Sequence, residues 1–169
     1  MNNLIKKQTI MFIVMVIVGM LFNPMNMLAY KIEHLYFSTT LFYGGLLMAS
    51  NMMWSHQIVH YFSMGHFNQY IFFIGLALSI SISIFLLRNQ FKVNDNQWLK
   101  RMISHHSTAL TTSHNIYNKT DNPDVKKLAS EIDLISISSI FLLIISQNES
   151  ENFSINNSLI KILGKLGSE

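Results

Sequence analysis

Three long apolar runs constrain the fold of this chain more than any other feature of its sequence. They cover residues 10–29, 37–54 and 70–87. A helix of about 20 apolar residues crosses the roughly 30 Å of hydrocarbon in a bilayer. Hydrophobic residues make up 50% of the chain and charged residues only 12%, a balance outside the usual range for a soluble domain. The sequence therefore predicts an all-α membrane protein, with a domain of three transmembrane helices over residues 10–88.

The first run follows a basic segment, residues 1–9, that contains Lys6 and Lys7. A signal peptide also begins with basic residues, but its apolar stretch is about 7–15 residues long and ends at a small-residue cleavage site. The run here is longer and lacks a convincing cleavage site, so we expect a retained helix, kinked at Pro24, which has no backbone N–H donor. Lys6 and Lys7 favour a cytoplasmic N-terminus, whereas basic residues beyond the third run favour the reverse.

Beyond residue 88 the chain becomes polar, and two helical patterns follow within residues 95–147. The first carries apolar residues at helical spacing from Trp98 to about residue 117. The second begins at Pro123, which suits the first turn of a helix, after Asn122, a good N-cap residue. A short turn joins the two, so we expect an extramembrane helical hairpin. Residues 148–169 are typical of a polar linker followed by a short amphipathic helix suited to a lipid surface.

The second hairpin helix contains a run that is apolar on every side. A helix pair exposed to water does not tolerate such a run, so it must pack on the membrane helices, on another copy of the chain or on the bilayer surface. A fourth crossing is disfavoured because Asp133 and the serines near it leave an apolar core shorter than about 17 residues. We therefore predict a docking surface toward lipid, a larger membrane complex or a second copy, formed by Ile140, Phe141, Leu142, Leu143, Ile144 and Ile145.

Two adjacent histidines, His105 and His106, lie in the first hairpin helix. Neighbouring residues on a helix point about 100° apart, so the two rings can hold a site only from its two sides. Met102 lies one turn before His106, and a thioether beside an imidazole suits copper better than calcium or magnesium. With three crossings, His34 lies on the same membrane face as the hairpin and is a further candidate ligand. The alternative is a pair of ordinary helix histidines, one of them partly exposed.

A second histidine pair, His56 and His60, follows the second apolar run. On a helix this spacing places two imidazoles one turn apart, an arrangement that binds zinc, copper or haem iron. The alternative is two interfacial histidines at the end of a helix. The loop next to this pair lies on the opposite membrane face from His34, so the pair would form a separate site.

Several classes of function have no support in the sequence. The chain contains no cysteine, which excludes disulfides and thiolate ligands. It has no Glu-x-x-His sequence of a di-iron bundle, no His-Glu-x-x-His zinc site, no P-loop and no Gly-x-Ser-x-Gly elbow. Its few basic residues form no stripe of the kind that binds nucleic acid. We therefore predict a non-catalytic protein that does not bind nucleic acid.

Two segments form a paired pattern around the adjacent histidines. Residues 99–109 contain Met-Ile-Ser-His-His-Ser-Thr-Ala, and residues 122–132 read Asn-Pro-Asp-Val-Lys-Lys-Leu-Ala-Ser-Glu-Ile. Together they resemble the domain of unknown function 305 family, and the similarity to a membrane-anchored subgroup with three spans extends over about residues 10–140. The resemblance implies a ferritin-like hairpin, periplasmic and associated with copper in some members, with the N-terminus in the cytoplasm.

The second hairpin helix departs from the pattern of that family. Ser136, Ser139 and Leu143 stand where the family usually carries Gln, Glu and Met, and Thr112 replaces a methionine that often follows the histidine motif. Two hypotheses follow. One is a small integral membrane protein with a copper-binding hairpin. The other is an accessory or structural subunit of a larger membrane complex that has lost metal ligands and docks through its apolar second hairpin helix.

Overall fold

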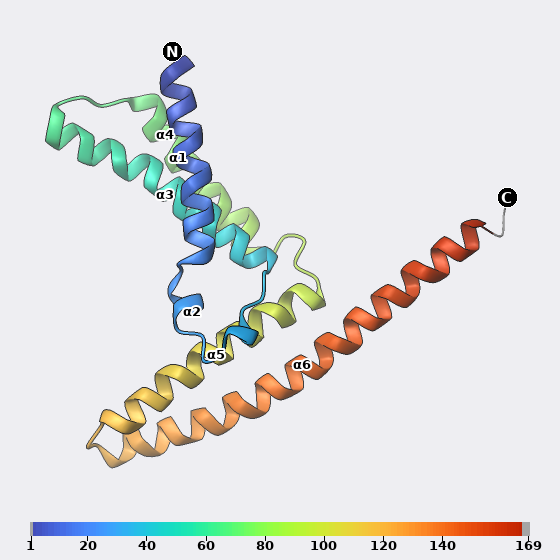
Figure 1. Ribbon diagram of the computed structural model, residues 1–169. Helices are drawn as coiled ribbons and strands as arrows, with labels where there is room; N and C mark the ends of the chain where they lie inside the picture. The colour runs from blue at the N-terminus through green and yellow to red at the C-terminus, as the bar shows by residue number, and fades with distance from the viewer. Residues whose placement is uncertain (1, 167–169) are drawn as a thin grey trace. The chain divides into compact units, whose positions relative to one another are not determined.

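The computed structural model describes the backbone of residues 2–166 and the side chains of residues 5–153 (Figure 1). The described residues are helical with no β-strand, which confirms the predicted all-α class. Contacts divide them into two compact units, residues 2–27 with 37–93 and residues 28–36 with 94–166. The elements in chain order are α1 (Asn2–Leu21), α2 (Pro24–Met27), the 3-10 helix η1 (Ile32–His34), α3 (Thr39–Met64), α4 (Gln69–Ser81), the π-helix η2 (Ile82–Arg88), α5 (Asp95–Lys119) and α6 (Pro123–Leu166).

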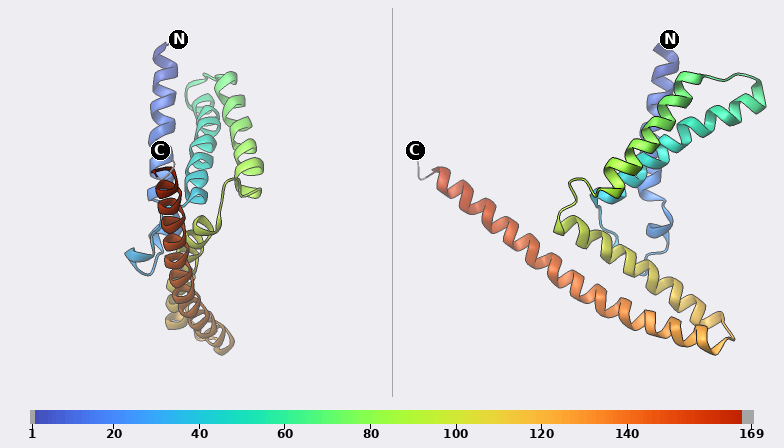
Figure 2. Two further views of the ribbon diagram at one scale, coloured as in Figure 1. Left: turned by 90° about the vertical axis from the view of Figure 1, so that its right-hand side faces the viewer. Right: turned by 180° about the vertical axis from the view of Figure 1, so that it is seen from behind.

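In the first unit α3 packs against both α1 and α4, and the views agree that these helices lie side by side (Figure 2). Glycines make the contacts close. A Cβ added at Gly45 of α3 would lie 2.8 Å from the carbonyl oxygen of Val16 in α1. One added at Gly75 of α4 would lie 2.9 Å from the backbone nitrogen of Trp54 in α3. Small residues that let backbones approach closely are typical of helix contacts in membranes, so the first unit packs in the manner of a membrane bundle.

The first helix breaks before Pro24 instead of merely bending there. α1 ends at Leu21, and the four-residue helix α2 begins at Pro24. Asn23 and Asn26 donate side-chain hydrogen bonds through Nδ2 to the carbonyl oxygen of Met20, at 2.9 and 2.7 Å. These asparagines replace helical hydrogen bonds that the break removes. The interruption was predicted at the right place, but as a kink instead of a break.

Three helical stretches are long and apolar enough to cross a membrane, by length and composition alone: Ile5–Met27, Gln69–Arg88 and Pro123–Phe153. Two of them correspond to predicted spans. The predicted span at residues 37–54 is not among them, because α3 carries polar side chains such as Asn51 along its length. The third stretch lies in α6, where a crossing was disfavoured. The number of apolar helices therefore agrees with the prediction, and the identity of one does not.

In the second unit α5 and α6 pack together as the predicted hairpin (Figure 1). Asn94 caps α5 by accepting a hydrogen bond from Gln97 N at 3.0 Å. Asn122 accepts from Asp124 N at 2.9 Å and Pro123 opens α6, as the sequence predicted. The hairpin core consists of Ile103, Leu110 and Ile140, with Tyr36, Leu143 and Ile144 packed against it.

The polar linker predicted after residue 147 is absent, since α6 continues through it to Leu166. The sequence from 147 to 158 contains no glycine or proline to end the helix. Glu151 also ties this part of α6 to its surroundings: it accepts a hydrogen bond from Gln147 Nε2 at 3.1 Å and pairs with Lys100 Nζ of α5 at 3.1 Å. The side chains of the predicted amphipathic tail lie outside the described residues.

The predicted docking run divides between two faces of α6. Ile140 is buried in the hairpin core, and Leu143 and Ile144 pack against that core. Phe141 and Leu142 are 65% and 62% exposed. They belong to a larger apolar surface, here named the outer face of α6, which comprises Leu134, Ile135, Ile137, Phe141, Leu142 and Ile145.

Candidate functional site

The adjacent histidines lie within α5 and have different surroundings. His105 is exposed, whereas His106 is half-buried. Their ring centroids are 5.8 Å apart and their ring planes are inclined at 80°. Burial, followed by the neighbouring His105, lowers the pKa of His106 below its usual value, which favours the neutral ring. A neutral imidazole keeps a lone pair for a metal, which leaves His106 chemically able to act as a ligand.

His34 is bound to α5 through two serines. Its side chain is buried, and its Nδ1 lies 2.9 Å from Ser107 Oγ. Ser107 Oγ also accepts a hydrogen bond from Tyr30 N at 2.8 Å. Ser104 Oγ donates to the carbonyl oxygen of His34 at 2.8 Å, and both serines are buried. Residues 28–36, here named the strap, are therefore fastened to α5 by three polar contacts.

The sequence did not predict the structural role of these two serines. Ser104 and Ser107 immediately flank His105 and His106, so they belong to the same motif as the two candidate ligands. A serine on a helix carries no local signal for a distant partner, because its hydroxyl can also bond the carbonyl one turn earlier. The motif therefore has a demonstrated structural role, which is to hold the strap.

A cavity of about 390 Å³ lies beside the strap. Its lining includes Lys31 and His34 of the strap. His114 of α5 and Asp133 of α6 also line it, with His114 Nδ1 3.9 Å from Asp133 Oδ2, and Asp133 Oδ1 is buried without a hydrogen-bond partner. Burial, and then the positive charge of Lys31, lower the pKa of His34. The structure thus groups His34 with His114, whereas the adjacent histidines of α5 do not line this cavity.

No metal site is preformed in the part of the chain that the structure describes. That part contains no group of three or more histidine, aspartate or glutamate side chains placed to hold an ion. Met102 is half-buried, one turn before His106 on α5. The copper ligand set of His105, His106, Met102 and His34 therefore stays a prediction.

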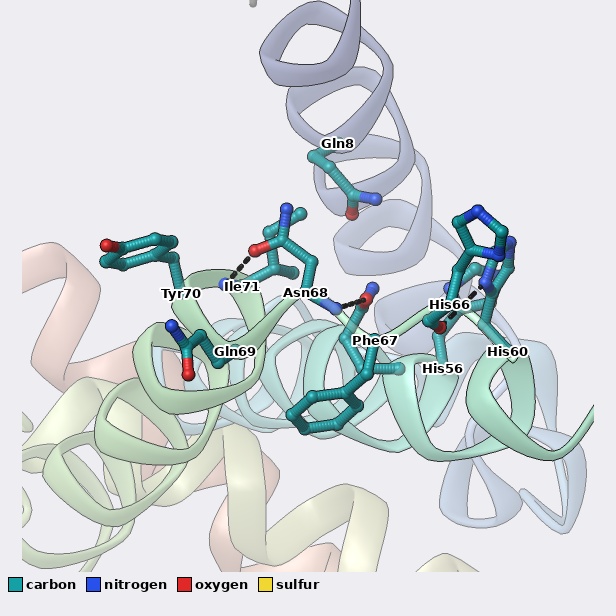
Figure 3. A pocket seen from close by; sticks show the side chains of 10 residues that line it. Gln8, His56, His60, His66, Phe67, Asn68, Gln69, Tyr70 and Ile71 are labelled. Carbon is teal, nitrogen blue, oxygen red and sulfur yellow. Dashed lines mark hydrogen bonds between the residues drawn. The ribbon is translucent and has the colours of Figure 1, made fainter. Parts of the chain in front are cut away.

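The second histidine pair lies near the end of α3, beside a cavity of about 510 Å³ (Figure 3). The ring centroids of His56 and His60 are 5.8 Å apart. Gly65, with φ of 70°, ends α3 and begins the turn that brings His66 to the same cavity. The ring centroid of His66 is 6.4 Å from that of His60. Gln8 of α1 lines the cavity as well, so the structure adds a third histidine and an amide to the predicted pair.

Comparisons with known proteins support the family resemblance over the hairpin. The family described as domain of unknown function DUF305 matches residues 86–135, which cover α5 and the beginning of α6. An uncharacterised protein of Acanthamoeba polyphaga mimivirus is 43% identical over 53 residues, or 31% of this chain and 35% of that protein. The chain thus spans about a third of the length of this relative. No solved structure matches the chain. Neither match carries a known function, so function has to be argued from the residues.

Proposed function

We propose that the chain is a non-catalytic membrane protein whose hairpin lies on the bilayer surface, with the outer face of α6 against lipid and α5 toward water. The observation that carries this proposal is the exposure of large apolar side chains along α6, among them Leu134 at 68% and Phe141 at 65%. A large exposed apolar surface of this kind marks an interaction site in a stable protein. Lipid suits it because the most apolar 18-residue window of the stretch Pro123–Phe153 has a mean hydropathy of 2.0.

The polar side chains of α5 favour a hairpin that lies along the surface over one that crosses the bilayer. His105, Thr112, His114 and Asn115 are all exposed on α5. Because α5 packs along α6, a crossing would carry these side chains into the hydrocarbon. Ionisable residues within membrane spans almost always face protein or a water-filled cavity. A helix lying in the interface instead buries only its apolar side, to a depth of about 5–10 Å.

The proposed orientation has the N-terminus in the cytoplasm and the hairpin on the other side of the membrane. Lys6 and Lys7 support the cytoplasmic N-terminus through the preference of basic residues for that side. α1 leads through α2 directly into the strap, and the strap is fastened to α5. If the stretch Ile5–Met27 crosses the bilayer, the strap and the hairpin lie on the side opposite the N-terminus.

The absence of cysteine allows a direct test with single labelled cysteines. Leu142→Cys places an environment-sensitive fluorophore on the outer face of α6, and Thr112→Cys places the same label on exposed α5. In liposomes we expect doxyl-labelled lipids to quench the label at 142 and aqueous iodide to quench the label at 112. Iodide quenching at both positions would refute the proposal. Protection of position 142 from both quenchers would refute it too, and would favour a protein partner and hence an accessory subunit.

Copper binding by the adjacent histidines is a second candidate function. One observation favours it: exposed His105 lies beside half-buried His106, with ring centroids 5.8 Å apart, and burial lowers the pKa of His106. Half-buried Met102 adds a thioether at the next turn of α5. A hairpin with α6 on lipid would present this pair to the aqueous side, where the ion would be accessible.

A further inference from the structure

We propose that His56, His60 and His66 bind one transition-metal ion, such as Zn²⁺ or Cu²⁺, at the end of α3. This site lies in the first unit and does not depend on the function proposed for the hairpin. His56 and His60 come from consecutive turns of α3, and His66 comes from the loop that follows it. Figure 3 shows the three imidazoles gathered on one side of the cavity.

The hydrogen bonds of two of these rings leave the correct nitrogen available for a metal. His60 donates through Nδ1 to the carbonyl oxygen of His66 at 3.1 Å, and His66 donates through Nδ1 to the carbonyl oxygen of Met64 at 2.9 Å. A carbonyl oxygen can only accept, so both rings must carry their proton on Nδ1. In the neutral ring Nε2 then holds the lone pair. Metal-bound histidines typically have this arrangement, with the second nitrogen donating to a backbone carbonyl.

Two buried polar atoms beside the same cavity have no hydrogen-bond partner. They are His56 Nδ1 and Gln8 Oε1, and both residues line the cavity. Leaving a buried polar atom unpaired costs about 1–3 kcal/mol, so such atoms are uncommon unless they serve a bound group. An ion coordinated by His56 through Nδ1 would satisfy that atom, and a water molecule on the ion would donate a hydrogen bond to Oε1 of Gln8.

The donor set selects the class of ion. The residues lining the cavity include no aspartate or glutamate, which calcium and magnesium require, and no lysine or arginine to repel a cation. Imidazole suits zinc, copper and nickel. Three imidazoles and one water give the four ligands of a tetrahedral zinc ion.

The rings lie somewhat farther apart than they would around a bound ion. Two imidazoles on one tetrahedral ion, at metal–nitrogen distances of about 2.0–2.1 Å, have ring centres roughly 5 Å apart. The observed separations are 5.8 Å for His56 and His60 and 6.4 Å for His60 and His66. His66 is exposed and His60 is half-buried, so there is room for shifts that keep the hydrogen bonds of their Nδ1 atoms. The three rings are not placed to hold an ion as they stand, so binding would draw them together.

The test is a zinc titration of the full-length chain in detergent, measured by isothermal titration calorimetry. A background variant with His105→Ala and His106→Ala removes the candidate hairpin site. In this background we expect about one Zn²⁺ per chain. Loss of a residue that only supports a metal ligand typically weakens binding by roughly 10–100-fold, so the loss of the ligand itself in His66→Ala should weaken zinc binding by at least that factor. Ser63→Ala, which removes an exposed polar side chain of α3 that does not line this cavity, is the control and should leave the affinity unchanged.

Electron paramagnetic resonance of bound Cu²⁺ then counts the nitrogens, with three expected in the background variant and two after His66→Ala. Because His66 lies in an exposed loop, its replacement should leave the helical circular dichroism spectrum intact. Unchanged zinc affinity after His66→Ala would overturn the three-histidine site. The same affinity after replacement of His56, His60 and His66 together, or no binding by the background variant, would overturn the site altogether.

Discussion

Adjacent glycines in α3 allow the close approach of α1 and α3 to be measured with its own internal control. A Cβ on Gly45 would lie 2.8 Å from the carbonyl oxygen of Val16 and 2.7 Å from Cγ of Met20, whereas a Cβ on Gly44 would meet nothing within 4 Å. Met20 can turn aside, but Val16 contributes a backbone atom, so α1 and α3 would have to separate. Substitution of alanine for glycine within a helix gains about 1 kcal/mol in helix propensity at either position.

The difference between the two variants isolates the cost of separating the helices, because the propensity gain cancels. Overpacking a close contact typically costs about 1–3 kcal/mol. We expect Gly44→Ala to be stabilised by up to about 1 kcal/mol and Gly45→Ala to be less stable than Gly44→Ala by about 1–3 kcal/mol. Equilibrium unfolding in mixed detergent micelles, followed by circular dichroism, measures both free energies. Equal free energies of unfolding would refute the close packing of α1 on α3 at this point.

Three further predictions concern the hairpin. Ser107→Ala leaves Tyr30 N and the ring of His34 without their partner. It should lower the free energy of unfolding by about 1–3 kcal/mol and speed hydrogen exchange at the Tyr30 amide. Unchanged exchange at Tyr30 would argue that the strap is not fastened to α5. Burial lowers the pKa values of His34 and His106 in the folded chain, so both take up protons more readily when the chain is unfolded. The free energy of unfolding should therefore fall as the pH drops below about 6.5, the usual pKa of histidine. A free energy of unfolding that does not change between pH 7.5 and 5.5 would contradict this. His105→Ala together with His106→Ala should abolish copper uptake by the hairpin in metal analysis, and full retention would exclude the pair as ligands.

The parts of the fold that were predictable from the sequence are those with strong local signals. The hairpin turn was located because Asn122 caps α6 and Pro123 suits its first turn. The break near Pro24 was located for a similar reason, since proline acts on the helix that contains it. By contrast, the continuity of α6 beyond residue 147 was not predicted, because the serines and asparagines there are typical of a linker, although no glycine or proline ends the helix. The pairing of Glu151 with Lys100 of α5 joins residues too far apart in the sequence to leave a mark in local composition.

The same distinction applies to the sites. The adjacent histidines and the pair at His56 and His60 were visible as spacings on a helix. The partnership of His34 with Ser107 joins positions 73 residues apart, and only the folded strap shows it. His66 joins the second pair because Gly65 adopts a left-handed conformation that ends α3. The sequence shows the residues of a site more readily than it shows which of them meet.

The measurement that tests the central claim most directly is the depth of spin labels along α6. Single cysteines at Leu134, Ile137, Phe141 and Ile145 on the outer face would each carry a nitroxide, and relative accessibility to oxygen and to a water-soluble nickel complex would give its depth in liposomes. A hairpin lying on the surface predicts similar depths of about 5–10 Å below the headgroups at all four positions. A steady change of depth from one end to the other, by about 1.5 Å per residue, would mean that α6 crosses the membrane and would contradict the account.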